Sequence, residues 1–189
     1  PPLQPQGNEV VRAIGSSPDD AFSLIYVTML SAINSAETEA WLTNAYFIPD
    51  PQLLAVLKAA ATRGVDVRLV VPSSTDSALV FHAGRSYYDE LLREGVMIFE
   101  RRGALMHAKT AVIDGVWSTV GSTNLDWRSF LHNQEVNAVV LGTEFGDRMR
   151  AAFTRDLAQS DQITLEKWRH RPIGVRVKER LARVWQYWL

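Results

Sequence analysis

The chain has no cysteine, no long apolar run and almost no net charge. Without cysteine it can form no disulfide, no thiolate zinc site and no thiol nucleophile. No stretch approaches the roughly 18 consecutive apolar residues of a membrane-spanning helix, so we expect no span. The 20 basic and 21 acidic side chains nearly cancel, and 47% of the 189 residues are hydrophobic. These values are typical of one globular domain that folds without a disulfide or a structural metal.

The near-zero net charge hides an uneven distribution along the chain. The last 25 residues, 165–189, hold 7 basic and 2 acidic side chains, so the body is acidic and the tail basic. We therefore expect three parts: a linker-like start over residues 1–16, a body over 17–164 and a basic amphipathic tail over 165–189. The start is rich in proline and glutamine and has no methionine, which is typical of a piece of a longer protein.

The hydrophobic pattern predicts alternating helices and strands. Helices are expected at residues 17–36, 50–64, 76–94, 143–159 and 175–189. Strands are expected at residues 39–47, 65–71, 96–99, 106–113, 116–120 and 135–141. The first strands alternate with helices and should pair in parallel, whereas Asp114-Gly115 is a tight-turn dipeptide that should join two antiparallel strands. The fold class is thus α/β, a mixed parallel/antiparallel sheet flanked by helices on both faces.

Polar side chains that suit an anion gather between Met106 and Glu135. His107 and Lys109 are two apart in a strand-like run, so both should point to the same face of the sheet. Ser122 and Asn124 are also two apart, just after a glycine that lets a ligand approach the backbone. An ammonium, an amide and a hydroxyl fit a phosphodiester, and the imidazole could attack phosphorus or carry protons. We expect no metal and no cofactor.

Each of these residues also has a purely structural interpretation. His107 could be a strand histidine bonded to backbone, and Asp114 is already explained by the Asp-Gly turn. Ser122 and Asn124 could be turn residues, and Glu135 could be an exposed strand acid. The spacing of His107 and Lys109 together with the G-S-x-N segment favours the phosphodiester interpretation for His107 and Lys109.

The motif H-x-K-x4-D at His107, Lys109 and Asp114, followed by G-S-x-N at residues 121–124, resembles the signature of the phospholipase D superfamily. The likeness extends to most of the chain. Residues 44–72, 85–100, 117–130 and 168–172 resemble the C-terminal half of bacterial cardiolipin synthases.

This resemblance implies a phosphatidyltransferase built from two phospholipase D-like halves. Each half would give one motif to a shared site that works through a phosphohistidine and without metal. The first-half histidine would be the nucleophile, and His107 would protonate the leaving alcohol and deprotonate the incoming one. Lys109, Ser122 and Asn124 would bind phosphate, Asp114 would be catalytic or structural, and Glu135 would hold the non-reacting ring nitrogen of His107.

The same resemblance implies the partners. These are a phospholipid substrate such as phosphatidylglycerol, and an N-terminal half or a second copy of the chain. The acidic body disfavours nucleic acid, although a phospholipase D hydrolase, a nuclease or a non-catalytic half are alternatives. The basic tail, with Leu181, Val184, Trp185 and Trp188 on one side, could lie on an anionic membrane or pack on its own body. A peripheral position at the cytoplasmic side of a bacterial membrane is expected.

Overall fold

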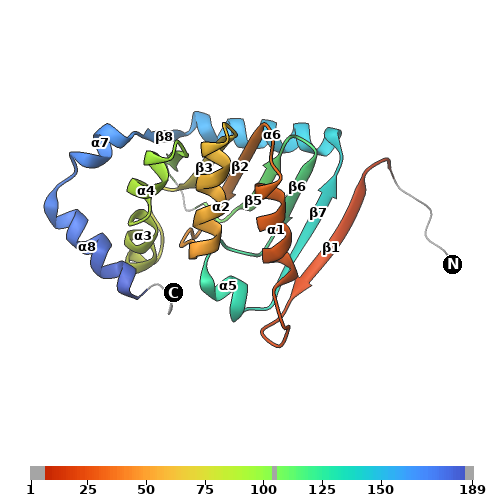
Figure 1. Ribbon diagram of the computed structural model, residues 1–189, viewed down its shortest axis with the longest axis horizontal. Coiled ribbons are helices and arrows are strands. Elements are labelled where there is room, and N and C mark those ends of the chain that lie inside the picture. The colour runs from red at the N-terminus through yellow and green to blue at the C-terminus, as the bar shows by residue number, and fades with distance from the viewer. Residues whose placement is uncertain (1–6, 104–105, 186–189) are drawn as a thin grey trace.

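The computed structural model describes residues 7–103 and 106–185, which form one eight-stranded sheet with helices on both faces (Figure 1). The strand order is β1-β7-β6-β5-β2-β3-β4-β8. β3 pairs in parallel with β2 and β4, and all the other neighbours are antiparallel. The predicted mixed α/β class is confirmed. The strands are β1 (Val10–Ser16), β2 (Glu39–Asn44), β3 (Asp66–Pro72), β4 (Met97–Arg101), β5 (Lys109–Ile113), β6 (Trp117–Gly121), β7 (Glu135–Leu141) and β8 (Ser160–Ile163).

The helices cover the two faces of the sheet unequally. α1 and α2 lie over one face, α6 crosses the other, and α3, α4, α7 and α8 gather beside β4 and β8 (Figure 1). Their bounds are α1 (Leu24–Asn34), α2 (Pro51–Thr62), α3 (Ala78–Arg85), α4 (Tyr88–Arg93), α5 (Trp127–Leu131), α6 (Thr143–Ala158), α7 (Leu165–Arg169) and α8 (Ile173–Val184). No helix in the described ranges has both the length and the apolar character to cross a bilayer.

The central strands are buried on both faces. On β2, Ala40 and Leu42 point into the main core beneath α1 and α2. Trp41 points the other way and stacks on Phe153 of α6, with ring centroids 5.2 Å apart. Layers on both faces explain why the strands of this region are almost continuously apolar in the sequence.

The β5–β6 hairpin turns where the sequence predicts it. Asp114 and Gly115 both adopt positive φ, at 50° and 63°. Two consecutive positive φ values make the type I′ geometry whose twist matches a two-residue hairpin, and aspartate and glycine tolerate it best. The antiparallel pairing of β5 with β6 is confirmed.

The N-terminal expectations were partly wrong. Val10–Ser16, expected within a linker, form β1 and pair with β7 along its whole length. The predicted helix 17–36 begins only at Leu24, because the Ser23 hydroxyl accepts from the Tyr26 amide at 3.3 Å and caps the helix there. Ser17 to Asp20 instead close a turn, in which the Asp20 carboxylate accepts from the Ser17 amide at 2.7 Å.

Other element boundaries also moved. The predicted helix 76–94 is two helices, α3 and α4, because the Ser86 hydroxyl bonds the Ala83 carbonyl at 2.6 Å where α3 ends. β5 begins at Lys109, so His107 precedes the strand instead of lying inside it. The helix predicted for 175–189 is present as α8, and its expected last turn with Trp188 lies outside the described residues.

Candidate active site

The predicted site lies at the end of the sheet where β5 begins. The register places Asn44 of β2 opposite Lys109, and Gly121 of β6 opposite Asn137 of β7. Since Thr110 pairs with Val120, Lys109 and Gly121 stand at the same level. Four neighbouring strands thus bring Asn44, Lys109, Gly121 and Asn137 into one row, which ends where the loops carrying Ser122 and Asn124 begin.

The Lys109 side chain is held beside His107 by a hydrogen bond to the His107 backbone, and not by the alternation of side chains along a strand. The Lys109 ammonium donates to the His107 carbonyl oxygen at 3.0 Å, and the lysine is only 7% exposed. Burial lowers the pKa of Lys109, while the nearby charges of Glu135 and Asp126 act in the opposite direction. The His107 side chain is exposed. Its ring lies edge-on to that of Tyr46, with centroids 6.3 Å apart. The site therefore pairs a buried cation with an accessible imidazole.

Two neighbouring side chains, those of Ser122 and Asn133, hold the Glu135 carboxylate by hydrogen bonds. The Ser122 hydroxyl donates to one carboxylate oxygen and the Asn133 amide donates to the other at 3.2 Å. The Ser122 oxygen also accepts from the Val136 amide at 3.0 Å. In the described part of the chain, no hydrogen bond joins the His107 ring to Glu135. The Ser122 hydroxyl has a single proton, and it is donated to the Glu135 carboxylate.

Gly121 is required by the packing of the row. A Cβ at this position would lie 1.9 Å from Oδ1 of Asn137 and 2.5 Å from the Val136 carbonyl oxygen. That same Asn137 oxygen accepts from the Thr123 hydroxyl at 2.9 Å. The glycine thus leaves room for the amide that fixes the loop leading to Asn124.

A hollow of about 390 Å³ opens beside this loop. Its lining residues come from the end of β2, the start of α3 and the segment around α5: Tyr46, Asp76, Ser77, Val80, Asn124, Asp126, Arg128, Ser129 and Asn133. The side-chain amide oxygen of Asn124 is buried without a hydrogen-bond partner in the described part of the protein. The Tyr46 hydroxyl donates to Asp76 at 2.5 Å, and this bond with burial raises the pKa of Tyr46 to about 12. Tyr46 and Asn124 thus give this hollow a polar lining.

Asp126 brings a second unusual carboxylate to the hollow. It caps α5 by accepting from the Ser129 amide at 2.7 Å and is buried. Burial raises its pKa to about 6, although the hydrogen bonds from Ser129 act in the opposite direction. The site thus holds a group that changes charge near neutral pH.

The structure does not bring Asp114 to the other predicted site residues. It follows the far end of β5, about 16 Å along the strand from Lys109 at the usual rise per residue. Its carboxylate accepts from the amides of Glu37, Thr38 and Glu39 and from the Thr38 hydroxyl, at 2.8–3.3 Å. Burial would raise the pKa of Asp114, but these donors outweigh it and lower the pKa. Asp114 ties the hairpin to the start of β2.

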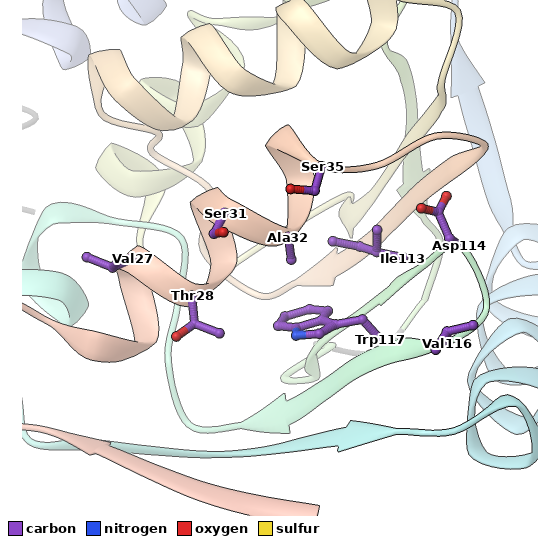
Figure 2. A pocket seen from close by; sticks show the side chains of 9 residues that line it. All are labelled: Val27, Thr28, Ser31, Ala32, Ser35, Ile113, Asp114, Val116 and Trp117. Carbon is purple, nitrogen blue, oxygen red and sulfur yellow. The ribbon is translucent and has the colours of Figure 1, made fainter. Parts of the chain in front are cut away.

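A larger hollow lies at the Asp114 end of β5, away from His107 and Lys109. It measures about 510 Å³ and lies between α1 and the β5–β6 hairpin (Figure 2). It is lined by Val27, Thr28, Ser31, Ala32, Ser35, Ile113, Asp114, Val116 and Trp117. Figure 2 shows mostly apolar and hydroxyl side chains there, and it includes no cation and no imidazole. The described lining of the larger hollow offers no cation for a phosphodiester, whereas the lining of the smaller hollow beside Asn124 includes Arg128.

Sequence reasoning missed several residues that build the site. Asn44 accepts from the amides of Tyr46 and Leu125, both at 3.2 Å, and so joins β2 to the loop before α5. An asparagine at the end of a strand is a weak signal. Asp126, three residues before Ser129, matches a helix-cap pattern that could have located α5. Tyr46 follows the end of β2 and lines the hollow, but an aromatic residue at a strand end is as typical of packing as of a site.

The comparisons with known proteins agree with this architecture. The family described as "Cardiolipin synthase, PLD-like domain" matches residues 29–157. A cardiolipin synthase of Geobacillus sp. (strain WCH70) is 37% identical over 178 residues, which cover 94% of this chain and 36% of the relative. The chain therefore spans little more than a third of the length of such curated relatives.

Two solved structures share the fold. Nuc from Salmonella typhimurium, a phospholipase D family member, has a TM-score of 0.69 at 23% identity, over 83% of this chain and 99% of that one. Phosphatidylserine synthase from Haemophilus influenzae Rd KW20 has a TM-score of 0.76 at 10% identity, over 96% of this chain and 48% of that one. Because the family match covers more than half of its residues, the chain belongs to the phospholipase D-like domain family of cardiolipin synthases.

Proposed function

We propose that the chain is one half of a phosphatidyltransferase that moves a phosphatidyl group from one phosphatidylglycerol to the hydroxyl of a second. One observation carries this proposal: a buried lysine ammonium is fixed beside an exposed histidine, at the strand end that carries Ser122 and Asn124. The sequence identity to cardiolipin synthases supports the choice of lipid. The expected place at the cytoplasmic side of a bacterial membrane stays a prediction.

Lys109 would neutralise the phosphoryl oxygens. An ammonium in a poorly solvated place interacts with an anion more strongly than one in water. The amide of Asn124, which lines the adjacent hollow, would add a neutral hydrogen bond to the same oxygens. Because the Ser122 hydroxyl is already bound to Glu135, we assign Ser122 to positioning that carboxylate and not to direct phosphate contact.

The proposed reaction has two displacements at phosphorus. A histidine of the other half forms the N–P bond while the O–P bond to the first glycerol breaks, and His107 gives its proton to the leaving oxygen. His107 then takes the proton of the second alcohol, whose oxygen forms the new O–P bond as the N–P bond breaks. The exposed imidazole of His107 has the access that both proton transfers need.

Glu135 and Asp114 take supporting roles in this proposal. Glu135 would balance the charge of Lys109 and hold the Ser122 loop, and a contact with the His107 ring would need a change in the geometry described above. Asp114 would act through the hairpin, at a distance from the phosphoryl group.

The second half would bind to the sheet beside the site. On the face of the sheet opposite α1 and α2, Val11, Val120 and Val136 are exposed on β1, β6 and β7. Since β6, β7 and β1 are neighbours, these valines lie on one side of adjacent strands, and exposed apolar side chains that gather on one face commonly mark protein interfaces. A second phospholipase D-like half would cover it, and a second copy of this chain is the alternative.

The proposal is tested by phosphatidyl transfer in mixed micelles of phosphatidylglycerol and detergent, with glycerol release as the readout. The two-half enzyme should turn over, and its His107→Ala variant should lose at least a hundredfold in rate, because proton transfer contributes about 10²–10⁴. The matched control is His170→Ala, which changes an exposed histidine just after α7 and should keep the rate. The chain without its partner half should be inactive. A loss of less than about tenfold in His107→Ala would contradict the assignment, as would hydrolysis of nucleic acid in place of transfer.

A further inference from the structure

α8 turns its apolar side away from the protein. Ile173, Val177, Leu181 and Val184 recur at i, i+4, i+8 and i+11 and therefore share one face of the helix. They and the following Trp185 are between 50% and 75% exposed. A helix on the surface of a globular protein ordinarily buries this face, so the arrangement is inverted.

The opposite side of α8 is fixed to the body by charged and aromatic contacts. Glu179 is 1% exposed and accepts from Nε and Nη2 of Arg171 at 3.0 and 2.8 Å. The Arg183 guanidinium lies 4.3 Å from the centre of the Tyr87 ring. A buried ion pair of this kind would leave an uncompensated charge if the helix rolled, so the outward direction of the apolar face is fixed.

Basic side chains flank the apolar face. At 100° per residue, Arg176 and Arg180 lie along one border and Lys178 lies along the other. All three are exposed, and within the described part of the chain none has an acidic side chain in ion-pair range. Apolar side chains bordered by free cations complement a bilayer that carries anionic headgroups.

We propose that the outward face of α8 docks on an anionic lipid bilayer, with the helix axis parallel to the membrane surface. The inference extends the proposed function by naming how the enzyme meets its lipid, but it stands on α8 and not on the reaction. The acidic body would be repelled by the same surface, so the charge distribution also orients the molecule.

Docking through α8 would bring the candidate site towards the membrane. The C-terminal end of α8 lies along the same edge of the molecule as α5 (Figure 1). The helices that line the hollow near Asn124 also carry exposed apolar residues, Leu79 on α3 and Leu131 on α5. These residues would join the contact and shorten the path of a phospholipid headgroup to Lys109.

The test is flotation of the chain with vesicles of phosphatidylcholine, either alone or with about one third phosphatidylglycerol. The wild type should bind only the anionic vesicles. Ile173→Ser with Leu181→Ser should weaken binding at least tenfold, because two apolar side chains no longer enter the interface. Arg176→Gln with Arg180→Gln should weaken it about 25-fold, since each cation near such a surface contributes about fivefold. All four positions are exposed, so the variants should fold.

Matched controls separate this inference from general surface effects and from the proposed function. Val116→Ser and Arg148→Gln change an exposed apolar and an exposed basic residue elsewhere and should bind vesicles as the wild type does. The α8 variants should keep phosphatidyl transfer in detergent micelles, whereas a failure of the proposed chemistry would remove activity there and leave vesicle binding intact. Equal binding to neutral and anionic vesicles, or α8 variants that bind vesicles normally but no longer assemble with the other half, would overturn the inference.

Discussion

At the scale of single residues, the site depends on charges that are only partly compensated. The pKa of Lys109 is lowered by burial in spite of two nearby carboxylates. Asp126, one of these carboxylates, has a pKa raised to about 6. A bound phosphodiester would bring a negative charge to Lys109 and would favour the protonated form of Asp126. Substrate binding and the protonation of this carboxyl should therefore be linked.

The raised pKa of Asp126 predicts a pH dependence of stability. The folded state holds this proton more tightly than the unfolded state, so ionising Asp126 costs stability as the pH rises from about 4 to above 6. Asp126→Asn keeps an oxygen that can cap α5 and removes the cost. Denaturant unfolding at about pH 4 and pH 7.5 should show the variant gaining on the order of 2 kcal/mol relative to the wild type at the higher pH. If the difference in unfolding free energy between variant and wild type were the same at the two pH values, burial of the Asp126 carboxylate would not be the origin of a pH-dependent stability.

At the scale of elements, strand β5 separates the two ends of the H-x-K-x4-D motif. The strand that carries Lys109 at its start carries Asp114 just past its end, so a sequence motif that reads as one cluster is divided between a site and a turn. The sequence could place the turn, because Asp-Gly has the conformational tolerance that a type I′ turn needs. It could not place the carboxylate contacts with residues 37–39, which depend on the neighbouring β2.

Other helices and strands also differ in whether they follow from local sequence signals or only from contacts with distant residues. Helix α2 was predictable because Asp50 and Pro51 form a local start signal, and the Asp50 carboxylate does cap the helix at the Leu53 amide. β8 was not predictable, because its sequence Ser-Asp-Gln-Ile is polar and becomes a strand only by pairing with β4. His107 was placed on a strand because Met106 and Ala108 continue the apolar pattern, and periodicity alone does not show where pairing begins.

Glu179 is predicted to hold helix α8 on the rest of the protein. Glu179→Ala would remove the carboxylate that pairs with Arg171 and lies 3.9 Å from Arg85 of α3, and it should loosen α8 on the body at a cost of about 3 kcal/mol in unfolding free energy. Hydrogen exchange should become faster along α8 while the sheet stays protected. Arg180→Ala, an exposed neighbour on the same helix, serves as the control and should change neither quantity. Unchanged exchange in α8 of the Glu179 variant would show that other contacts hold the helix.

At the scale of the whole molecule, three features lie in different places. The residues proposed to bind phosphate lie at one end of the sheet, the exposed valines lie on β1, β6 and β7, and the basic helix α8 lies beyond β4 and β8. In the proposed enzyme each has its own occupant: a phosphoryl group, a second half and a bilayer. The exposed valines border the proposed site, as a site shared by two halves requires, whereas α8 lies at the other edge of the sheet.

The central claim is that Lys109 and its neighbours bind a phosphodiester, and nuclear magnetic resonance tests it most directly. The isotopically labelled chain would be titrated with a soluble glycerol phosphodiester. The account predicts saturable shifts at the amides of Lys109 and Asn124 and at the His107 ring, and their loss in Lys109→Gln. The absence of saturable shifts, or shifts confined to the hollow around Ser31 and Trp117, would contradict it.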